Sequence, residues 1–372
     1  MDPLAHTLVG AALARTRLAR GVPLATTALV AAANLPDLDV LAYLGGEDAA
    51  LGFRRGLTHG PLGLALLPAT LVGILALATR RRRARGEPVP LGRLAGLAYL
   101  GALTHPLLDL LNVYGVRLLA PFSWRWFYGD VLFIVDPWFW LILGTTVFLV
   151  REPTRRALAL WLAATGAATY LLVARTTPAW AVAAWCAAIA AVIVARLLWR
   201  EALCRRREAI NAAALASWLA YLAAMSGVTL VARRAVATEL ARLGVAPVAR
   251  TMVAPLAVDP RPRDVVVEAP GGYRFGRYSL VTGELALEAA VEPWPSSSPV
   301  VRAALADPAV RGFVGWARFP FARLEPAGEL VRVHLLDGRY VREPPTSGRR
   351  FGSATVELPA DPTLRPGAVP GR

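Results

Sequence analysis

Long runs of apolar residues recur along the first 232 residues and limit the possible folds more than any other feature. Each run matches the roughly 17–25 residues that cross a bilayer as a helix. The expected spans are 22–44, 59–79, 91–114, 133–150, 156–174, 178–198 and 210–232, preceded by a shorter apolar helix at 3–19. With 56% hydrophobic residues, the chain is too apolar for an ordinary soluble enzyme. The pattern predicts an all-α polytopic membrane bundle.

Arginine clusters predict how this bundle is oriented. The net charge is +15 and the chain has no lysine, so arginine carries all the basic charge. The clusters fall at alternate junctions between spans, at 15–20, 80–85, 151–156 and 200–207. Because cytoplasmic loops are enriched in basic residues, we expect these junctions in the cytoplasm, and the N-terminus and the C-terminal region outside it. Arginines at span ends are typical of topology signals and lipid-headgroup contacts, so we expect membrane lipids as partners and no nucleic acid.

The composition changes after about residue 235. Proline, arginine, glutamate and glycine become more frequent, and short alternating runs at 264–268, 284–288 and 329–334 indicate strands. We predict a transmembrane helical domain over 1–234, a small extracytoplasmic β-rich soluble domain over 235–360, and a flexible Pro/Gly-rich tail over 361–372. Heavy use of Ala, Arg, Gly and Pro is typical of a GC-rich bacterial genome, so the expected location is a bacterial cytoplasmic (inner) membrane.

Histidines and aspartates gather in or beside the apolar runs. Ionisable groups are costly to keep there and are therefore candidates for a functional site. Asp109 follows His105 by four residues, so both lie on one helix face. Pro36 indicates a helix break within the span that carries Asp37. Imidazoles and carboxylates together suit a divalent metal, and we expect one or two zinc ions. The predicted metal ligands are His6, Asp37, Asp39, His59, His105 and Asp109.

The predicted orientation places all six candidate ligands at one depth, near the outer membrane face. Two metal ions could there activate a water and clamp an in-line displacement at phosphorus. The predicted catalytic residues are Asp39, Asp136 and Arg55. Asp136 would serve as a further ligand or general base, and Arg55, like Arg54 and Arg125, would bind an anionic substrate group. Simpler roles stay open, since an aspartate such as Asp39 can cap a helix.

Four motifs in this region resemble the YdjM-like family of bacterial inner-membrane metal-dependent hydrolases, described as regulated by or binding LexA. They are Asp2–Gly10, Leu35–Asp39, Arg55–Gly60 and Leu103–Asp109, within about the first 150 residues. That family is distantly similar to zinc-dependent phospholipase C and to single-strand nucleases, which hold zinc clusters. The resemblance implies His6, Asp37 or Asp39, His59, His105 and Asp109 as ligands. A later H-x-x-x-E motif is missing from the sequence, so one or two ions are expected rather than three.

These observations favour an integral-membrane metal-dependent hydrolase that acts at the outer face of the cytoplasmic membrane. Its substrate would be a phosphoester or acyl ester of an amphiphilic or anionic small molecule. One alternative is a metal- or ion-handling transporter, because buried His and Asp also mark ion pathways. Another is a membrane scaffold without catalysis, whose C-terminal domain binds a partner. The sequence leaves the oligomeric state open.

Overall fold

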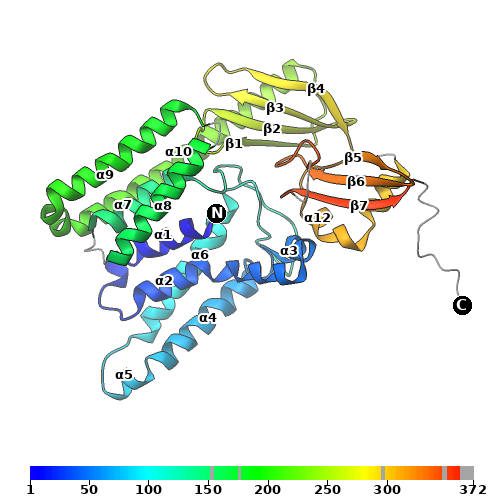
Figure 1. The fold of residues 1–372 in the computed structure, drawn as a ribbon. Helices are drawn as coiled ribbons and strands as arrows, with labels where there is room; N and C mark the ends of the chain where they lie inside the picture. Colours follow the sequence, from blue (N-terminus) through cyan, green and yellow to red (C-terminus); the bar gives the residue numbers. More distant parts are fainter. Residues whose placement is uncertain (151–154, 175–176, 295–297, 346–349, 361–372) are drawn as a thin grey trace, which may run out of the picture. The chain divides into compact units, whose positions relative to one another are not determined.

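The computed structural model describes residues 1–150, 155–174, 177–294, 298–345 and 350–360. The chain divides into two compact units that do not follow chain order. The first, here the helical unit, contains 1–38, 55–231 and 254–261. The second, here the C-terminal unit, contains 39–54, 232–253 and the described residues from 262 onward. Figure 1 shows the ribbon coloured along the sequence.

Helices build the helical unit, as the apolar periodicity predicts. The α-helices are α1 (Pro3–Leu13), α2 (Ala25–Asn34), α4 (Pro61–Ala78), α5 (Arg80–Ala84), α6 (Leu91–Leu110), α7 (Pro137–Val150), α8 (Arg155–Ala174), α9 (Ala179–Arg205) and α10 (Arg207–Arg242). Two 3-10 helices are η1 (Arg17–Ala19) and η2 (Leu35–Gly45). Residues 39–45 of η2 and 232–242 of α10 belong to the C-terminal unit. Helix α2 packs against both α1 and α6, and α6 also packs against α4.

Glycines let three of these helices approach closely. A Cβ atom added to Gly10 on α1 would lie 2.9 Å from the Leu29 carbonyl oxygen on α2, and one added to Gly101 on α6 would lie 2.8 Å from the same atom. Gly10 lies one helical turn after His6, and Gly101 one turn before His105. The close packing of α1 and α6 on α2 therefore brings the two histidines into one region of the bundle.

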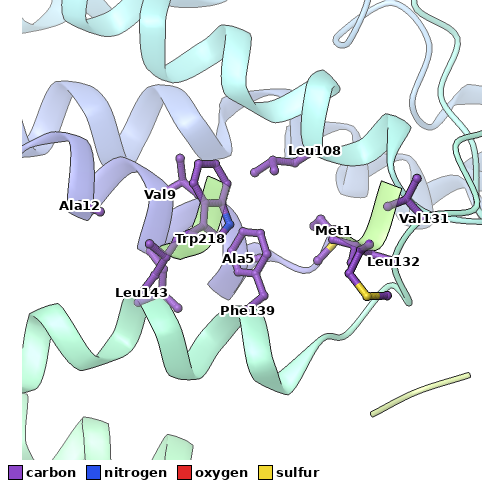
Figure 2. Packing of buried hydrophobic residues seen from close by; sticks show 12 residues of the cluster. Met1, Ala5, Val9, Ala12, Leu108, Val131, Leu132, Phe139, Leu143 and Trp218 are labelled. Carbon is purple, nitrogen blue, oxygen red and sulfur yellow. The ribbon is translucent and has the colours of Figure 1, made fainter. Parts of the chain in front are cut away.

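The other side of α1 belongs to an apolar core. Ala5, Val9 and Ala12 recur at helical spacing and are buried. Figure 2 shows them packed with Leu108 of α6, Phe139 and Leu143 of α7, and Trp218 of α10. The Phe139 and Trp218 rings meet edge to face, with centroids 5.5 Å apart. This core fixes α1 against three other helices.

Among the described residues, four helical segments are long and apolar enough to cross a membrane. They are Ala25–Gly45, Pro61–Ala78, Ala179–Arg205 and Arg207–Arg242. The sequence predicts seven spans, and those at 91–114, 133–150 and 156–174 stay predictions. Helix α7 has only 14 residues, and α6 carries polar residues that lower its hydropathy. The predicted class, a membrane helical region followed by a β-rich region, is confirmed.

Two antiparallel sheets dominate the C-terminal unit. The first has the order β1 (Arg250–Pro255), β2 (Pro262–Ala269), β3 (Gly272–Ser279) and β4 (Leu285–Pro293). The second has the order β5 (Pro320–Ala327), β6 (Leu330–Asp337) and β7 (Ser353–Pro359). Described pairs β2/β3, β3/β4, β5/β6 and β6/β7 are antiparallel. The three predicted strand segments coincide with β2, β4 and β6.

Aromatic side chains and short helices complete this unit. Phe275 of β3 contacts Phe321 of β5, and Tyr273 meets Phe319 edge to face, each pair with centroids 5.6 Å apart. The helices are α3 (Glu47–Phe53), α11 (Pro299–Leu305), η3 (Pro308–Val310) and α12 (Arg311–Trp316). Helix α3 packs against α12, although about 260 residues separate them in the chain. The predicted boundary at 234/235 is untested and stays a prediction.

Candidate metal centre

Four of the predicted ligands form one group that could hold a metal ion. Asp37, His59, His105 and Asp109 each offer a ligand atom, and these atoms all lie within 4.8 Å of one another. The side chains of His59, His105 and Asp109 have no exposed area, and that of Asp37 is 14% exposed. Buried carboxylates and imidazoles need partners, so their convergence is a costly and specific arrangement.

Helix α6 supplies two of the four ligand atoms from one face. Its α-helix continues through Pro106, so the spacing of four residues holds His105 above Asp109. The His105 Nε2 atom lies 3.6 Å from Asp109 Oδ2 and 3.7 Å from Asp37 Oδ1. Asp37 comes from η2, where the α-helical hydrogen bonding of α2 ends just before Pro36.

Both imidazoles turn their Nε2 atoms toward each other. His105 Nδ1 lies 2.6 Å from the Ala33 carbonyl oxygen, which only accepts, so this nitrogen carries the proton and Nε2 holds a lone pair. His59 Nδ1 hydrogen-bonds the Thr58 hydroxyl at 2.9 Å. The two Nε2 atoms are 3.2 Å apart. Backbone and hydroxyl contacts of this kind orient metal-binding histidines in proteins.

This donor set fits a divalent cation. His59 Nε2 is 3.2 Å from Asp109 Oδ2, close to the other separations in the group. A tetrahedral zinc ion with bonds of about 2.0–2.2 Å holds its ligand atoms about 3.3 Å apart. Two imidazole nitrogens and two carboxylate oxygens converge there, and these are the ligand atoms that a divalent cation takes. The residues present therefore fit the predicted metal.

Asp109 is the central group of the site. Its Oδ1 atom contacts the Met1 amino group and lies 3.5 Å from His6 Nε2. Its Oδ2 atom lies 3.0 Å from Arg55 Nε, besides the two histidine contacts already given. One carboxylate thus connects α1, the 55–59 turn and α6.

Arg55 is held within the protein and positions Asp109. Its φ of +54° is a left-handed conformation that places the residue in a tight turn. Nη1 donates to Asn112 Oδ1 at 3.1 Å and to the Gly115 carbonyl at 3.2 Å, and the guanidinium stacks 4.4 Å from the Tyr114 ring centroid. A guanidinium so engaged orients a carboxylate. Its predicted contact with substrate stays a prediction.

His6 lies beside the group, stacked on His105. The ring centroids are 3.7 Å apart and the planes differ by 13°. His6 is fully buried, and neither ring nitrogen makes a hydrogen bond within the described residues. The structure thus brings His6 to the site, and its role as a ligand stays a prediction.

Asp39 and Asp136 lie outside the converging group. A 3-10 helix turns about 120° per residue, so Asp37 and Asp39 point in different directions from η2. The buried Asp39 carboxylate accepts a hydrogen bond from Arg54 Nε at 3.1 Å. Asp136 precedes α7 and accepts from the Phe139 amide at 3.0 Å and the Tyr221 hydroxyl at 2.7 Å, as a capping residue does. Catalytic roles for both residues are untested.

Residues 111–132 support the site in a way that the sequence did not reveal. The Arg117 amide donates to the Arg55 carbonyl at 2.8 Å. Gly60 follows His59 in the chain, and a Cβ there would lie 2.0 Å from the Ala120 carbonyl oxygen. Arg117 stacks on Trp126 at 4.2 Å. A glycine directly after a candidate ligand was the available signal for this close approach.

Apolar helices that can span a membrane, together with a buried His/Asp group, define a membrane protein that could hold a metal ion. The chain belongs to the YdjM inner membrane protein family, whose model matches residues 1–201. This match includes all four residues of the group and confirms the resemblance seen in the motifs. Searches of curated proteins and of solved structures found no match. The more distant similarity to phospholipase C and nucleases has no support in these comparisons.

Proposed function

We propose that this protein is an integral-membrane metal-dependent hydrolase that binds zinc at Asp37, His59, His105 and Asp109. The observation that carries the proposal is the convergence of four ligand atoms, from three segments of the chain, within 4.8 Å of one another. Two imidazoles with carboxylates form a typical zinc donor set. When bound, the metal supplies Lewis acidity and lowers the pKa of a coordinated water to about 7. His6 is the proposed additional ligand.

The surrounding residues keep the ligands in a reactive arrangement. The Ala33 carbonyl fixes His105, the Thr58 hydroxyl orients His59, and Arg55 Nε holds Asp109. Ligands fixed in advance need no rearrangement when charge develops on a substrate. Asp37 is the one member of the group whose side chain is not fully buried, so water and substrate would enter beside it.

The proposed substrate is an amphiphile with a phosphoester or acyl ester at the outer leaflet. Helix α6 places His105 in the buried group, while Leu103 and Leu107, two residues away on either side, are exposed as lipid-facing side chains would be. A site on such a helix lies within reach of a lipid-borne ester. The outward orientation follows from the arginine clusters and the positive-inside rule.

Metal content of the full-length protein in detergent tests the proposal first. We expect elemental analysis to find about one to two zinc ions per chain. His59→Ala and His105→Ala should each remove most of this metal. The matched control is His334→Ala in β6, where His334 contacts Thr355 and Glu325. Wild-type protein without stoichiometric metal would refute the metal centre.

Ester turnover tests the second half of the proposal. Phospholipids and acyl esters in mixed micelles are followed by ³¹P NMR and by fatty-acid release, with zinc and with chelator. We expect turnover that chelation and His105→Ala abolish and His334→Ala preserves. Zinc uptake into proteoliposomes without ester turnover would instead identify a transporter.

A further inference from the structure

Residues 39–54 separate ligands of the metal centre in the chain, yet they belong to the C-terminal unit. The ligand Asp37 lies just before this segment, here the linking loop, and Arg55 and His59 follow it. The position of a segment between two ligands constrains the positions of both ligands. What holds the linking loop therefore bears on the metal centre.

Helix α3 in the linking loop makes a close backbone contact with α12. The Asp48 carboxylate accepts hydrogen bonds from the Gly312 amide at 2.9 Å and the Phe313 amide at 2.8 Å. A Cβ atom added to Gly312 would lie only 1.8 Å from the Asp48 carbonyl oxygen. A Cβ atom at Gly52 would lie 3.4 Å from the Gly312 Cα, an ordinary contact distance. Gly312 is therefore the position at which this contact leaves no room for a side chain.

An ion pair closes the ends of the linking loop. Arg54 Nε donates to Asp39 Oδ1 at 3.1 Å, and the Asp39 side chain has no exposed area. The Arg54 guanidinium also lies 5.7 Å from the Tyr43 ring centroid. Asp39 is two residues from the ligand Asp37, and Arg54 directly precedes Arg55, which holds Asp109. The pair thus joins the two ends of the loop, and these ends adjoin Asp37 and Arg55 in the sequence.

Helix α12 lies outside the residues matched by the family model, whereas α3 lies inside them. We propose that the C-terminal unit sets the metal affinity of the centre by holding α3 through Asp48 and Gly312. Release of α3 frees the linking loop, and Asp37 and His59 then lose part of their fixed geometry. Loss of outer contacts that position ligands typically weakens metal binding about 10–100-fold. This inference rests on the proposed metal site.

The α12 helix offers a matched pair of substitutions to test it. Gly312→Ala inserts a methyl group against the α3 backbone, whereas a Cβ at Gly315 of the same helix meets no atom within 4 Å. The Kd for Zn²⁺ is measured on full-length protein in detergent by competition with a fluorescent chelator. We expect Gly312→Ala to weaken binding at least about tenfold and Gly315→Ala to leave it unchanged. Equal affinities for the two variants would overturn the inference.

If Gly312→Ala does not fold, a second pair of substitutions tests the same inference. Asp48→Ala removes the hydrogen bonds to α12, and Asp307→Ala removes a similar cap on the Ala309 amide that involves no part of α3. We expect weaker zinc binding in the first variant only, with faster tryptic cleavage after Arg54 as α3 is released. Unchanged cleavage, or cleavage without a change in zinc Kd, also contradicts the inference. Absence of zinc binding in wild-type protein would instead refute the proposed function.

Discussion

Both units bury charged side chains, but they satisfy them differently. In the C-terminal unit, Asp337 accepts from the Arg318 amide at 2.8 Å, the Arg339 amide at 3.0 Å and the Arg339 guanidinium at 2.7 Å. Arg339 also stacks on Trp316, 4.5 Å from its centroid. Each of these partners of the carboxylate is a donor, so charge and hydrogen bonds balance.

The group in the helical unit does not balance in this way. Asp109 receives Arg55 as a donor, but it also faces His59 and His105 through their Nε2 atoms, with Asp37 nearby. Two cationic donors, the Met1 amino group and Arg55, share Asp109 with two imidazoles, and a second carboxylate lies beside them. The comparison teaches that burial of charge alone does not mark a functional centre, because a balanced network stabilises a fold. A buried group of imidazoles and carboxylates, by contrast, supplies the ligand atoms that a metal cation binds.

The largest effects on stability should come from neutralising the two buried carboxylates, Asp109 and Asp337. We expect Asp109→Asn and Asp337→Asn each to lower the free energy of unfolding by about 3–5 kcal/mol, because each leaves a buried arginine without its partner charge. Thermal unfolding of full-length protein with and without zinc distinguishes them. Zinc should still raise the Tm of Asp337→Asn, but not that of Asp109→Asn. A zinc response that survives Asp109→Asn would place the metal elsewhere.

Metal removal should affect one unit and spare the other. A ligand at one hundred times its Kd stabilises the folded state by about 2.7 kcal/mol. After chelation we expect faster hydrogen exchange in α6 and unchanged exchange in β6. His105→Ala should remove this difference. Equal acceleration in both elements would show that the chelator acts on the whole protein rather than on a centre in the helical unit.

Arg55 provides a sharper version of the same comparison. Arg55→Lys keeps the charge but loses the planar donors that reach Asn112 and Gly115, so Asp109 should be less well oriented. We expect zinc affinity about tenfold lower by chelator competition. Arg125→Ala is the control, since Arg125 is exposed and its guanidinium lies 5.5 Å from the Phe127 ring centroid. Loss of substrate turnover with unchanged zinc affinity would favour the predicted substrate role of Arg55.

Much of the fold was predictable from periodicity, and the exceptions have physical causes. The predicted span at 22–44 is α-helical only to Asn34; η2 follows, and Pro36, which has no amide to donate, lies at this change. The predicted span at 133–150 is shortened to α7, because Asp136 ends the preceding loop as a cap. Hydropathy cannot register a cap or a change from α to 3-10 helix.

The site was predictable where its geometry is local. The four-residue spacing of His105 and Asp109 survives in α6. Asp39 was predicted as a ligand together with Asp37, and the 3-10 turn points the two carboxylates in different directions. A ligand role for Asp39 stays a prediction. The supporting contacts involve backbone atoms, such as the Ala33 carbonyl, or distant partners, such as Gly312 for Asp48. Such contacts depend on the positions of backbone atoms and of distant segments, which the types of the residues do not specify.

Asp136 tests whether a buried carboxylate in the helical unit can be purely structural. Asp136→Ala removes the α7 cap and the acceptor of the Tyr221 hydroxyl, which we expect to cost about 1–2 kcal/mol. Metal content and ester turnover should stay at wild-type levels, as measured by elemental analysis and by ³¹P NMR. Loss of turnover with retained metal would instead support the predicted general-base role.

The smallest expected effect concerns Asp264 in the C-terminal unit, where an arginine only partly compensates the cost of burying the carboxylate. Burial raises the pKa of Asp264, and Arg342, with Nη2 2.7 Å from Oδ1, opposes that rise. A raised pKa means that the fold favours the protonated form, so this stabilisation is present below the unfolded pKa of about 3.9 and is lost as pH rises through the folded value. Asp264→Asn should reduce the pH dependence of the free energy of unfolding in this range by on the order of 0.5 kcal/mol, a small value because the pair is partly exposed. Tm measured against pH follows this change. An unchanged difference between variant and wild type from pH 3 to 6 would show that the Arg342 pair already balances the burial of Asp264, as Arg339 balances that of Asp337.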